Sequence, residues 1–518
     1  MSSTGRLIRN IASNWVGLLI NLVVSFFLAP FVVNSLGAAF YGIWALAGQF
    51  TGYLYLLDFG VRESVIKYTA KYAAQRQSVK LNRILTTAFL LYTPIFLLCV
   101  VAAVIGAWGF PSWFDVDAAH VDTARAVVFL VGVTIGQTFI FNVFTGILQG
   151  LHRFDIANLF GIGLSLVRAA LIIGALSLGY GIVALSVIQL GIALIGGLFT
   201  AFAALYYLKR AGLRFQLVRL SRRSLLALSR RVFGYSFYVF VNNIGQKTIV
   251  ASNAIVIGVF MPVASVTYFA IAASLIDYVR GLVTATAQVF NPLTSHYVAL
   301  RQDEAVRQVL IRGSKLTLFV GLPPIVAYLV LGPQFIALWM GPEFASQAGA
   351  VLLVLAVAAL FSCPHHTMSS VLYGMSRHSV IAYLRVAEAA INVVLSIVLI
   401  QDYGLVGVAL GSAIPHVVFV TLILPVVVCR RVGLPVRTFF AGAYLGPLLS
   451  AVPFAAGAFA LDALWPAGNL ATFFVQIGLL LGVYALAGYG LALDREERAI
   501  ARDYLRRPLA RLKLGHAK

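Results

Sequence analysis

Apolar runs of about 20 residues recur from one end of this 518-residue chain to the other. Each run is long enough to cross the roughly 30 Å hydrocarbon core of a bilayer as an α-helix. Hydrophobic residues make up 61% of the sequence and charged residues 11%, whereas an average soluble domain carries about 25% charged residues. Because a helix satisfies its own backbone hydrogen bonds, which lipid cannot do, the sequence predicts an all-α polytopic membrane protein.

The apolar runs predict about fourteen transmembrane helices. They lie near residues 11–34, 39–59, 84–109, 125–148, 157–178, 181–207, 233–260, 265–291, 313–332, 347–371, 379–401, 404–428, 438–461 and 469–492. Lys and Arg gather in alternate loops, and this positive-inside pattern places both termini in the cytoplasm. It also accounts for the net charge of +21 without a nucleic-acid partner. No small-residue cleavage site follows the first run, so we expect no cleavable signal peptide.

Three short motifs recur in the same order about 225 residues apart, which predicts a parallel repeat of six spans. The pairs are Lys71–Gln77 with His296–Gln302, Leu148–Gly150 with Leu372–Gly374, and Tyr180–Val183 with Tyr403–Val406. The predicted parts are an N-terminal lobe (1–207), a basic interfacial linker (208–232), a C-terminal lobe (233–430), two additional spans (431–493) and a basic cytoplasmic tail (494–518). Arg alternates with Leu in the linker, which favours a helix on an anionic membrane surface. Simple topogenic charge is the alternative.

Several cations lie deep inside the predicted spans. Lys247 and Arg168 have no acidic residue near them in sequence. An unpaired charge in hydrocarbon is costly, so these side chains should face water or an anionic ligand. Polar side chains at helical spacing accompany them in the first two spans of each lobe. The sequence therefore predicts a central cationic cavity that binds substrate, lined by Arg168, Lys247, Arg280, Asn21, Asn243, Gln246 and Asp277.

Arg and Lys suit phosphate oxygens, and amides suit hydroxyl groups, so this cavity favours a phosphorylated, sugar-bearing amphiphile. Packing between helices is the alternative role for the Asn positions. The pairs Asp277–Arg280 and Arg385–Glu388 are spaced i,i+3 and could instead neutralise each other. A second group, at the cytoplasmic ends of spans, is predicted to form a gate or to couple an ion: Asp58, Arg62, Glu63, Arg385 and Glu388.

Other motifs do not predict an enzyme or a metal site. Cys363-Pro364-His365-His366 resembles a metal-binding run, but adjacent residues on a helix point about 100° apart. Gly313-Ser314-Lys315 lacks the remainder of a phosphate-binding loop. A membrane glycosyltransferase or polymerase usually needs a large outer loop with catalytic groups, and the outer loops here are short. We therefore expect no catalytic residue and no cofactor.

The motif Leu36-Gly37-Ala-Ala-Phe-Tyr41-Gly42, followed by Leu56-Leu57-Asp58-Phe59-Gly60, resembles the polysaccharide transporter family. The loop Leu148-Gln-Gly150 with Arg153-Phe154 is also similar to that family. These are the O-antigen and exopolysaccharide flippases of the multidrug/oligosaccharidyl-lipid/polysaccharide flippase superfamily. The resemblance covers roughly the first 430 residues, and the last two spans depart from the twelve that many relatives have.

The resemblance implies two six-helix lobes arranged in a V, as in multidrug-and-toxin-extrusion proteins. It implies that a polyprenyl-pyrophosphate-linked oligosaccharide moves from the cytoplasmic to the periplasmic leaflet of the bacterial inner membrane by alternating access. The transport would need no cofactor beyond the membrane potential or a coupling Na⁺ or H⁺. Expected partners are the lipid-linked substrate, membrane lipids, a polysaccharide polymerase and a chain-length regulator, without nucleic acid. A multidrug exporter or a lipid II-type flippase is the alternative.

Overall fold

Helices form the regular structure of the part of the chain that the computed structural model describes, residues 3–494 and 497–498. Residues 499–518 of the predicted cytoplasmic tail lie outside it. Contacts group the chain into two units, residues 1–271 with 378–412 and residues 272–377 with 413–518. The lobe boundaries expected from the sequence stay a prediction.

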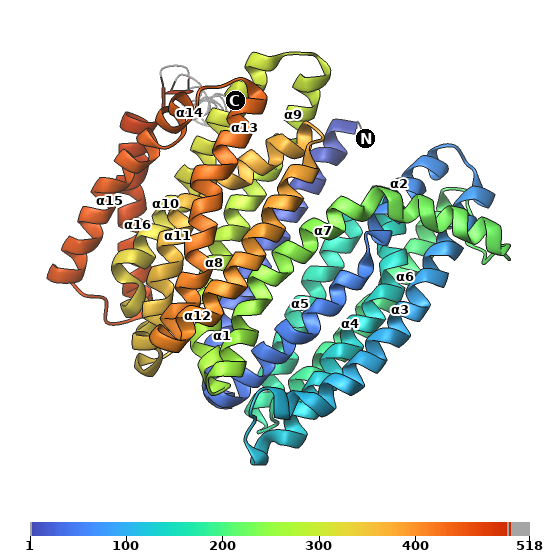
Figure 1. Cartoon of the computed structure of the whole chain (residues 1–518), viewed down its shortest axis with the longest axis horizontal. Helices are drawn as coiled ribbons and strands as arrows, with labels where there is room; N and C mark the ends of the chain where they lie inside the picture. Colours follow the sequence, from blue (N-terminus) through green and yellow to red (C-terminus); the bar gives the residue numbers. More distant parts are fainter. Residues whose placement is uncertain (1–2, 495–496, 499–518) are drawn as a thin grey trace, which may run out of the picture. The chain divides into compact units, whose positions relative to one another are not determined.

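The first unit holds most of the N-terminal helices. They are α1 (Ser3–Thr51), η1 (Gly52–Asp58), α2 (Val61–Ala74), α3 (Ser78–Trp113), η2 (Ala118–His120), α4 (Val121–Gly150), α5 (Phe154–Ser177), α6 (Ile182–Arg210) and α7 (Arg222–Phe260). Figure 1 shows α3, α4 and α6 side by side, and α4 contacts both neighbours. The helices α8 (Ala264–Gln288) and α12 (His378–Val418) contribute residues to both units.

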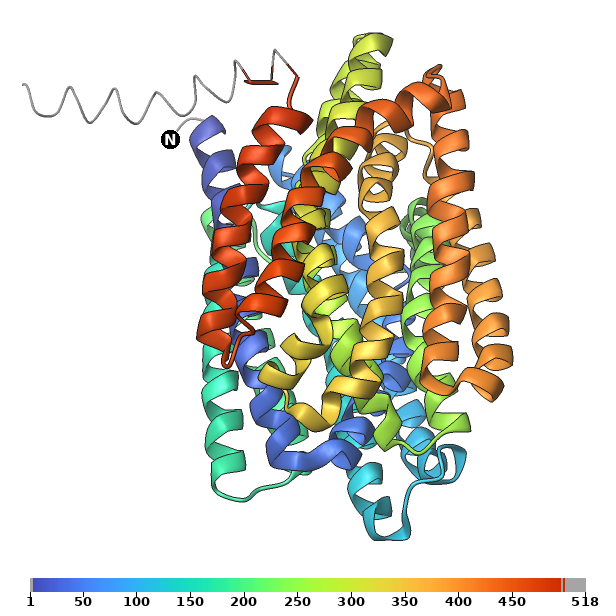
Figure 2. The same ribbon diagram turned by 90° about the vertical axis from the view of Figure 1, so that its left-hand side faces the viewer.

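The second unit holds the later helices. They are α9 (Phe290–Ala299), α10 (Asp303–Trp339), α11 (Pro342–Gly374), η3 (Phe419–Ile423), α13 (Leu424–Val432), α14 (Val436–Ala443), α15 (Leu445–Leu464), α16 (Leu470–Ala487) and η4 (Gly488–Ala492). The last two spans, α15 and α16, run side by side in Figure 2. They pack against α10, where the Tyr484 hydroxyl donates a hydrogen bond of 2.9 Å to the carbonyl oxygen of Phe319.

The helices confirm the predicted all-α membrane protein. Among the described residues, eleven helical stretches are long and apolar enough to cross a membrane. Two of them, Ile20–Asp58 and Ser379–Val432, contain a glycine with non-helical backbone angles, and each covers two predicted spans. The predicted span 233–260 lies on α7. Each of the fourteen predicted spans therefore falls on a helical segment.

A glycine makes the turn between the first two spans. Gly37 has φ 80° and ψ 164°, backbone angles that a residue with a Cβ rarely adopts. The turn lies between the predicted spans 11–34 and 39–59. The Thr267 hydroxyl donates a hydrogen bond of 2.6 Å to the carbonyl oxygen of Ala38 and ties the start of α8 to the residues after the turn.

The two copies of the sequence repeat form the same close contact between helices. A Cβ on Gly150 at the end of α4 would lie 2.6 Å from the Cβ of Thr69 on α2. In the second unit, a Cβ on Gly374 at the end of α11 would lie 2.6 Å from the Cβ of Thr294 on α9. Each pair of helices therefore approaches more closely than any residue with a Cβ would permit.

The short loops beside these contacts repeat as well. Arg76 and Arg301, which follow α2 and α9, have φ of 52° and 56°. His152 and Ser376, which follow α4 and α11, both have φ of 58°. Left-handed backbone is uncommon outside glycine, so its recurrence at matching positions supports the predicted parallel repeat.

The first half of the basic linker differs from the interfacial helix that its Arg and Leu pattern favours. Residues 213–220 are not helical. Asn82 Nδ2 donates a hydrogen bond to the carbonyl oxygen of Arg214, and the amide of Val218 donates one to the hydroxyl of Thr86. These side chains of α3 bind backbone groups that a helix would have used internally, and helical structure resumes at Arg222.

We predict that Gly150→Ala and Gly374→Ala each destabilise the protein. The added methyl group must displace a threonine, and overpacking of this kind typically costs about 1–3 kcal/mol. The measurement is the unfolding temperature of purified protein in detergent. Gly174→Ala on α5 is the matched control, because its added Cβ would meet nothing within 4 Å. Equal unfolding temperatures for all three variants would show that the close approaches are absent.

Candidate functional site

Lys247 lies half-buried on α7 and forms a hydrogen bond with a side chain of α1. Its Nζ donates a hydrogen bond of 3.0 Å to Oε1 of Gln49 on α1, and it lies 6.0 Å from the centre of the Tyr53 ring. The ammonium group occupies the space where Gly52 lacks a side chain, since a Cβ there would collide with it. An amide and an aromatic face thus surround this cation among the described residues, without a carboxylate.

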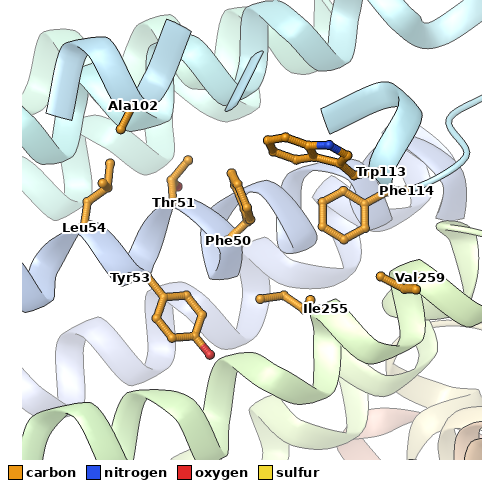
Figure 3. A pocket seen from close by; sticks show the side chains of 9 residues that line it. All are labelled: Phe50, Thr51, Tyr53, Leu54, Ala102, Trp113, Phe114, Ile255 and Val259. Atoms are coloured by element: carbon orange, nitrogen blue, oxygen red, sulfur yellow. The ribbon is translucent and has the colours of Figure 1, made fainter. Parts of the chain in front are cut away.

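Tyr53 also lines a pocket of about 500 Å³ within the first unit. Figure 3 shows the nine side chains around it, which come from the junction of α1 and η1, from α3 and the residue that follows it, and from α7. They are Phe50, Thr51, Tyr53, Leu54, Ala102, Trp113, Phe114, Ile255 and Val259. The volume lies within the range of about 300–1,000 Å³ that is typical of small-molecule sites.

The other cavity residues predicted on the first unit have different neighbours. Asn243 and Gln246 are exposed on α7, on the stretch that leads to Lys247. Asn21 on α1 accepts a hydrogen bond of 2.6 Å from the Ser165 hydroxyl of α5. One turn further along α5, Arg168 has a buried Nε that lacks a hydrogen-bond partner among the described residues. The hydrogen bond of Asn21 supports its predicted alternative role in helix packing, and the substrate-binding roles of Asn21 and Arg168 stay predictions.

Asp277 and Arg280 belong to the second unit, on α8. Arg280 Nη1 lies 2.6 Å from Asp277 Oδ1, and both side chains are about half exposed. This is the internal i,i+3 ion pair that the sequence left open as an alternative, and exposure keeps its energetic contribution small.

Three of the predicted gate residues, Asp58, Arg62 and Glu63, lie at the junction between η1 and α2. Asp58 accepts a hydrogen bond of 2.5 Å from the Tyr92 hydroxyl of α3. Phe59 and Gly60 follow with φ of 46° and 72°, which breaks the helix. Arg62 then donates a hydrogen bond of 3.1 Å to Gln149 of α4, whereas its buried Nε lacks a partner among the described residues. Glu63 is half-buried in the first turn of α2.

Arg385 and Glu388 form an ion pair inside the first unit. Arg385 Nη1 lies 2.9 Å from Glu388 Oε2, and the side chains are only 17% and 3% exposed. The backbone of Arg385 contacts α7 at Gly245, where a Cβ would lie 2.9 Å from it. The predicted alternative of mutual neutralisation is confirmed for this pair.

A buried polar network continues along the same face of α12. Asn392 accepts a hydrogen bond from Ser252 at 3.0 Å and donates one to Ser412 at 2.7 Å. Ser412 in turn donates to Asn253 at 2.8 Å. The four side chains join α7 to the segments of α12 before and after Gly404. They satisfy each other's hydrogen bonds, so we assign this network to the packing of helices.

Three histidines meet in the second unit. The rings of His365 and His366 on α11 have centres 4.0 Å apart, and His416 on α12 approaches His365 edge-on at 5.5 Å. The Thr284 hydroxyl oxygen lies 3.1 Å from His366 Nδ1, within hydrogen-bond distance. Among the described residues, no group of His, Cys, Asp and Glu has an arrangement that could hold a metal ion. Sequence analysis did not predict the contribution of His416.

Comparison with known proteins identifies the family. The family described as "Polysaccharide biosynthesis protein" matches residues 7–298 of the chain. The chain belongs to this family.

Relatives and a solved structure extend the comparison beyond the matched region. The chain is 23% identical over 509 residues to "Uncharacterized membrane protein EpsK" of Bacillus subtilis, which covers 95% of this chain and 96% of the relative. It is 22% identical to "Probable flippase AglR" of Haloferax volcanii, over 78% of each chain. The structure of the lipid II flippase MurJ in an inward closed conformation matches with a TM-score of 0.68 and 16% identity, over 93% of this chain and 98% of MurJ. This member of the family therefore shares the fold of MurJ.

We predict that Asn392→Ala lowers the free energy of unfolding by about 1–3 kcal/mol, because Ser252 and Ser412 lose a buried partner. The measurement is unfolding of the purified protein in detergent. Ser396→Ala is the matched control. Ser396 is fully buried one turn further along α12, and its hydroxyl oxygen lacks a hydrogen-bond partner among the described residues. A loss for Ser396→Ala as large as that for Asn392→Ala would contradict the role of the network.

Proposed function

We propose that this protein is a flippase that moves a polyprenyl-pyrophosphate-linked oligosaccharide from the cytoplasmic to the periplasmic leaflet by alternating access. The product would serve O-antigen or exopolysaccharide synthesis. The family membership supports a role in polysaccharide synthesis. The descriptions of AglR and MurJ as flippases, and the shared fold of MurJ, favour lipid transport. The protein acts in this proposal as a transporter and has no catalytic residue.

The setting of Lys247 carries the proposal. A cation inside a membrane protein is costly unless a charge or water compensates it. Lys247 donates to a neutral amide, Gln49, and among the described residues no carboxylate lies within ion-pair distance of it. It therefore retains positive charge for an anionic ligand such as a pyrophosphate, which it would bind as a point charge.

The other predicted residues have supporting roles in this proposal. Arg168 has the unpartnered Nε described above and suits a second phosphate oxygen. Asn243 and Gln246 are exposed beside Lys247 and suit sugar hydroxyls. Asp58, Arg62 and Glu63 lie at the break between η1 and α2, a position suited to a gate. The role of Arg280 in substrate binding remains a prediction from the sequence.

The membrane potential supplies a driving force in this proposal. An inside-negative potential favours outward movement of anionic charge by about 2.3 kcal/mol per charge per 100 mV. The same potential favours the return of an empty cationic site to the cytoplasmic side. A coupling Na⁺ or H⁺ is then unnecessary. The dependence of flipping on an imposed potential in proteoliposomes tests this driving force.

The proposal includes a location and partners. The protein would lie in the bacterial inner membrane with both termini in the cytoplasm, because Lys and Arg gather in the loops on that side. Its partners would be the lipid-linked substrate and a polysaccharide polymerase with its chain-length regulator. A surface polysaccharide assay in the host tests this assignment together with the function.

We predict that Lys247→Met and Arg168→Met abolish complementation of a host strain that lacks the gene. Loss of the cation removes an interaction with the pyrophosphate, and about 1.4 kcal/mol of lost binding weakens affinity tenfold, so surface polysaccharide should fall at least about tenfold. The lipid-linked intermediate should accumulate in the cytoplasmic leaflet. Both quantities are measured in membranes with matched protein levels.

Lys209→Met is the control, because Lys209 is exposed at the end of α6 and should restore the polymer fully. Full restoration by Lys247→Met and Arg168→Met as well would show that these cations have structural roles, and the proposed substrate site would be wrong.

A further inference from the structure

The pocket beside Lys247 has an almost entirely apolar lining. Phe50 contacts the rings of Trp113 and Phe114, with ring centres 5.7 Å and 5.9 Å apart, and Figure 3 shows these three side chains at one end. Leu54, Ala102, Ile255 and Val259 complete the walls. Aromatic and aliphatic walls of this kind gain most from burying an apolar ligand.

Three side chains of the lining carry a polar group, Thr51, Tyr53 and Trp113, and the two hydroxyl groups already have partners. The Thr51 hydroxyl donates a hydrogen bond of 2.6 Å to the carbonyl oxygen of Ala47, one turn back in α1. The Tyr53 hydroxyl interacts with the side chain of Thr248 of α7. The indole N–H of Trp113 is then the remaining polar group of the lining, and a pocket with so few polar groups fits a hydrocarbon chain better than a sugar or a nucleotide.

A positive charge lies at the Tyr53 end of the pocket. Lys247 Nζ is 6.0 Å from the centre of the Tyr53 ring. Along α7, Lys247 precedes Ile255 and Val259 by roughly 12–18 Å of helix rise. An anionic group at Lys247 could thus continue into a chain of a few isoprene units inside the pocket.

We propose that this pocket binds the prenyl segment next to the pyrophosphate of the carrier lipid, with the pyrophosphate at Lys247. The inference rests on the proposed function for the identity of the carrier. It adds a site in the first unit that recognises the lipid rather than the glycan. One transporter could then accept different glycans on the same carrier, because the constant part of the substrate is bound here.

Photo-crosslinking of the full chain in lipid nanodiscs tests the proposal. The probe is farnesyl pyrophosphate that carries a diazirine on its terminal isoprene unit. We expect label on peptides that contain residues 50–54, 102–114 or 255–259. Label confined to other parts of the chain would overturn the proposal.

Two phenylalanine variants on α3 test whether the pocket itself accepts the chain. Ala102→Phe fills the pocket and should reduce labelling at least about tenfold. Val101→Phe adds the same ring at the neighbouring position, where Val101 is 54% exposed, and should label as the wild type does. Ile255→Phe provides a second filling variant from α7 if Ala102→Phe does not fold. Undiminished labelling of a folded filling variant would overturn the proposal.

Two further probes identify the occupant. Lys247→Met should weaken labelling by the pyrophosphate probe at least about tenfold and leave labelling by the matching uncharged prenol unchanged. Equal weakening of both probes, or of neither, would overturn the link between the cation and the chain. A phosphatidylcholine with the diazirine on its acyl chain should label the pocket poorly, and efficient labelling would assign the pocket to membrane lipid instead.

These experiments separate the pocket from the proposed function. If the labelling pattern holds while Lys247→Met complements fully, the pocket binds prenyl pyrophosphate but the flippase mechanism is wrong. If Lys247→Met loses the polymer while the filling variants label normally, the flippase proposal stands and the pocket inference is wrong.

Discussion

The cost of an uncompensated charge inside a membrane protein shapes both the fold and the candidate site. Arg385 is neutralised by Glu388 in the interior of the first unit, and Asp58 accepts a hydrogen bond from the Tyr92 hydroxyl. Lys247 has a neutral partner, Gln49, and a neighbouring aromatic ring instead. A cation in this state retains binding energy for an anion, and this contrast with Arg385 and Asp58 is the basis on which we propose Lys247 as the ligand site.

The repeated architecture could be predicted because it depends on features local in sequence. Runs of apolar residues place the helices, and the position of Gly37 marks the turn between the first two. Gly150 and Gly374 lie in the motifs that recur in the sequence, and each allows a close contact between helices of its own unit. Spacing of i,i+3 likewise predicted that Arg385 and Glu388 could pair.

Contacts between distant parts of the chain could not be predicted in this way. Gln49 and Lys247 are 198 positions apart, and nothing in either helix indicates the partner. The linker was expected to be helical from its Arg and Leu pattern; its second half is, as the start of α7, but residues 213–220 are not, because Asn82 and Thr86 of α3 bind their backbone. The pocket depends on side chains from three segments that are far apart in the sequence, and most of these side chains are apolar residues of a kind that occurs throughout the spans.

Flipping in proteoliposomes tests the central claim most directly. Purified protein is reconstituted with a fluorescent polyprenyl-pyrophosphate-linked sugar, and loss of quenchable fluorescence is followed under an imposed potassium diffusion potential. The account predicts that wild-type protein flips the lipid faster than protein-free vesicles, that the potential favouring anion exit accelerates it, and that Lys247→Met removes most of the increase. A rate equal to that of protein-free vesicles, or one unaffected by Lys247→Met, would contradict the account.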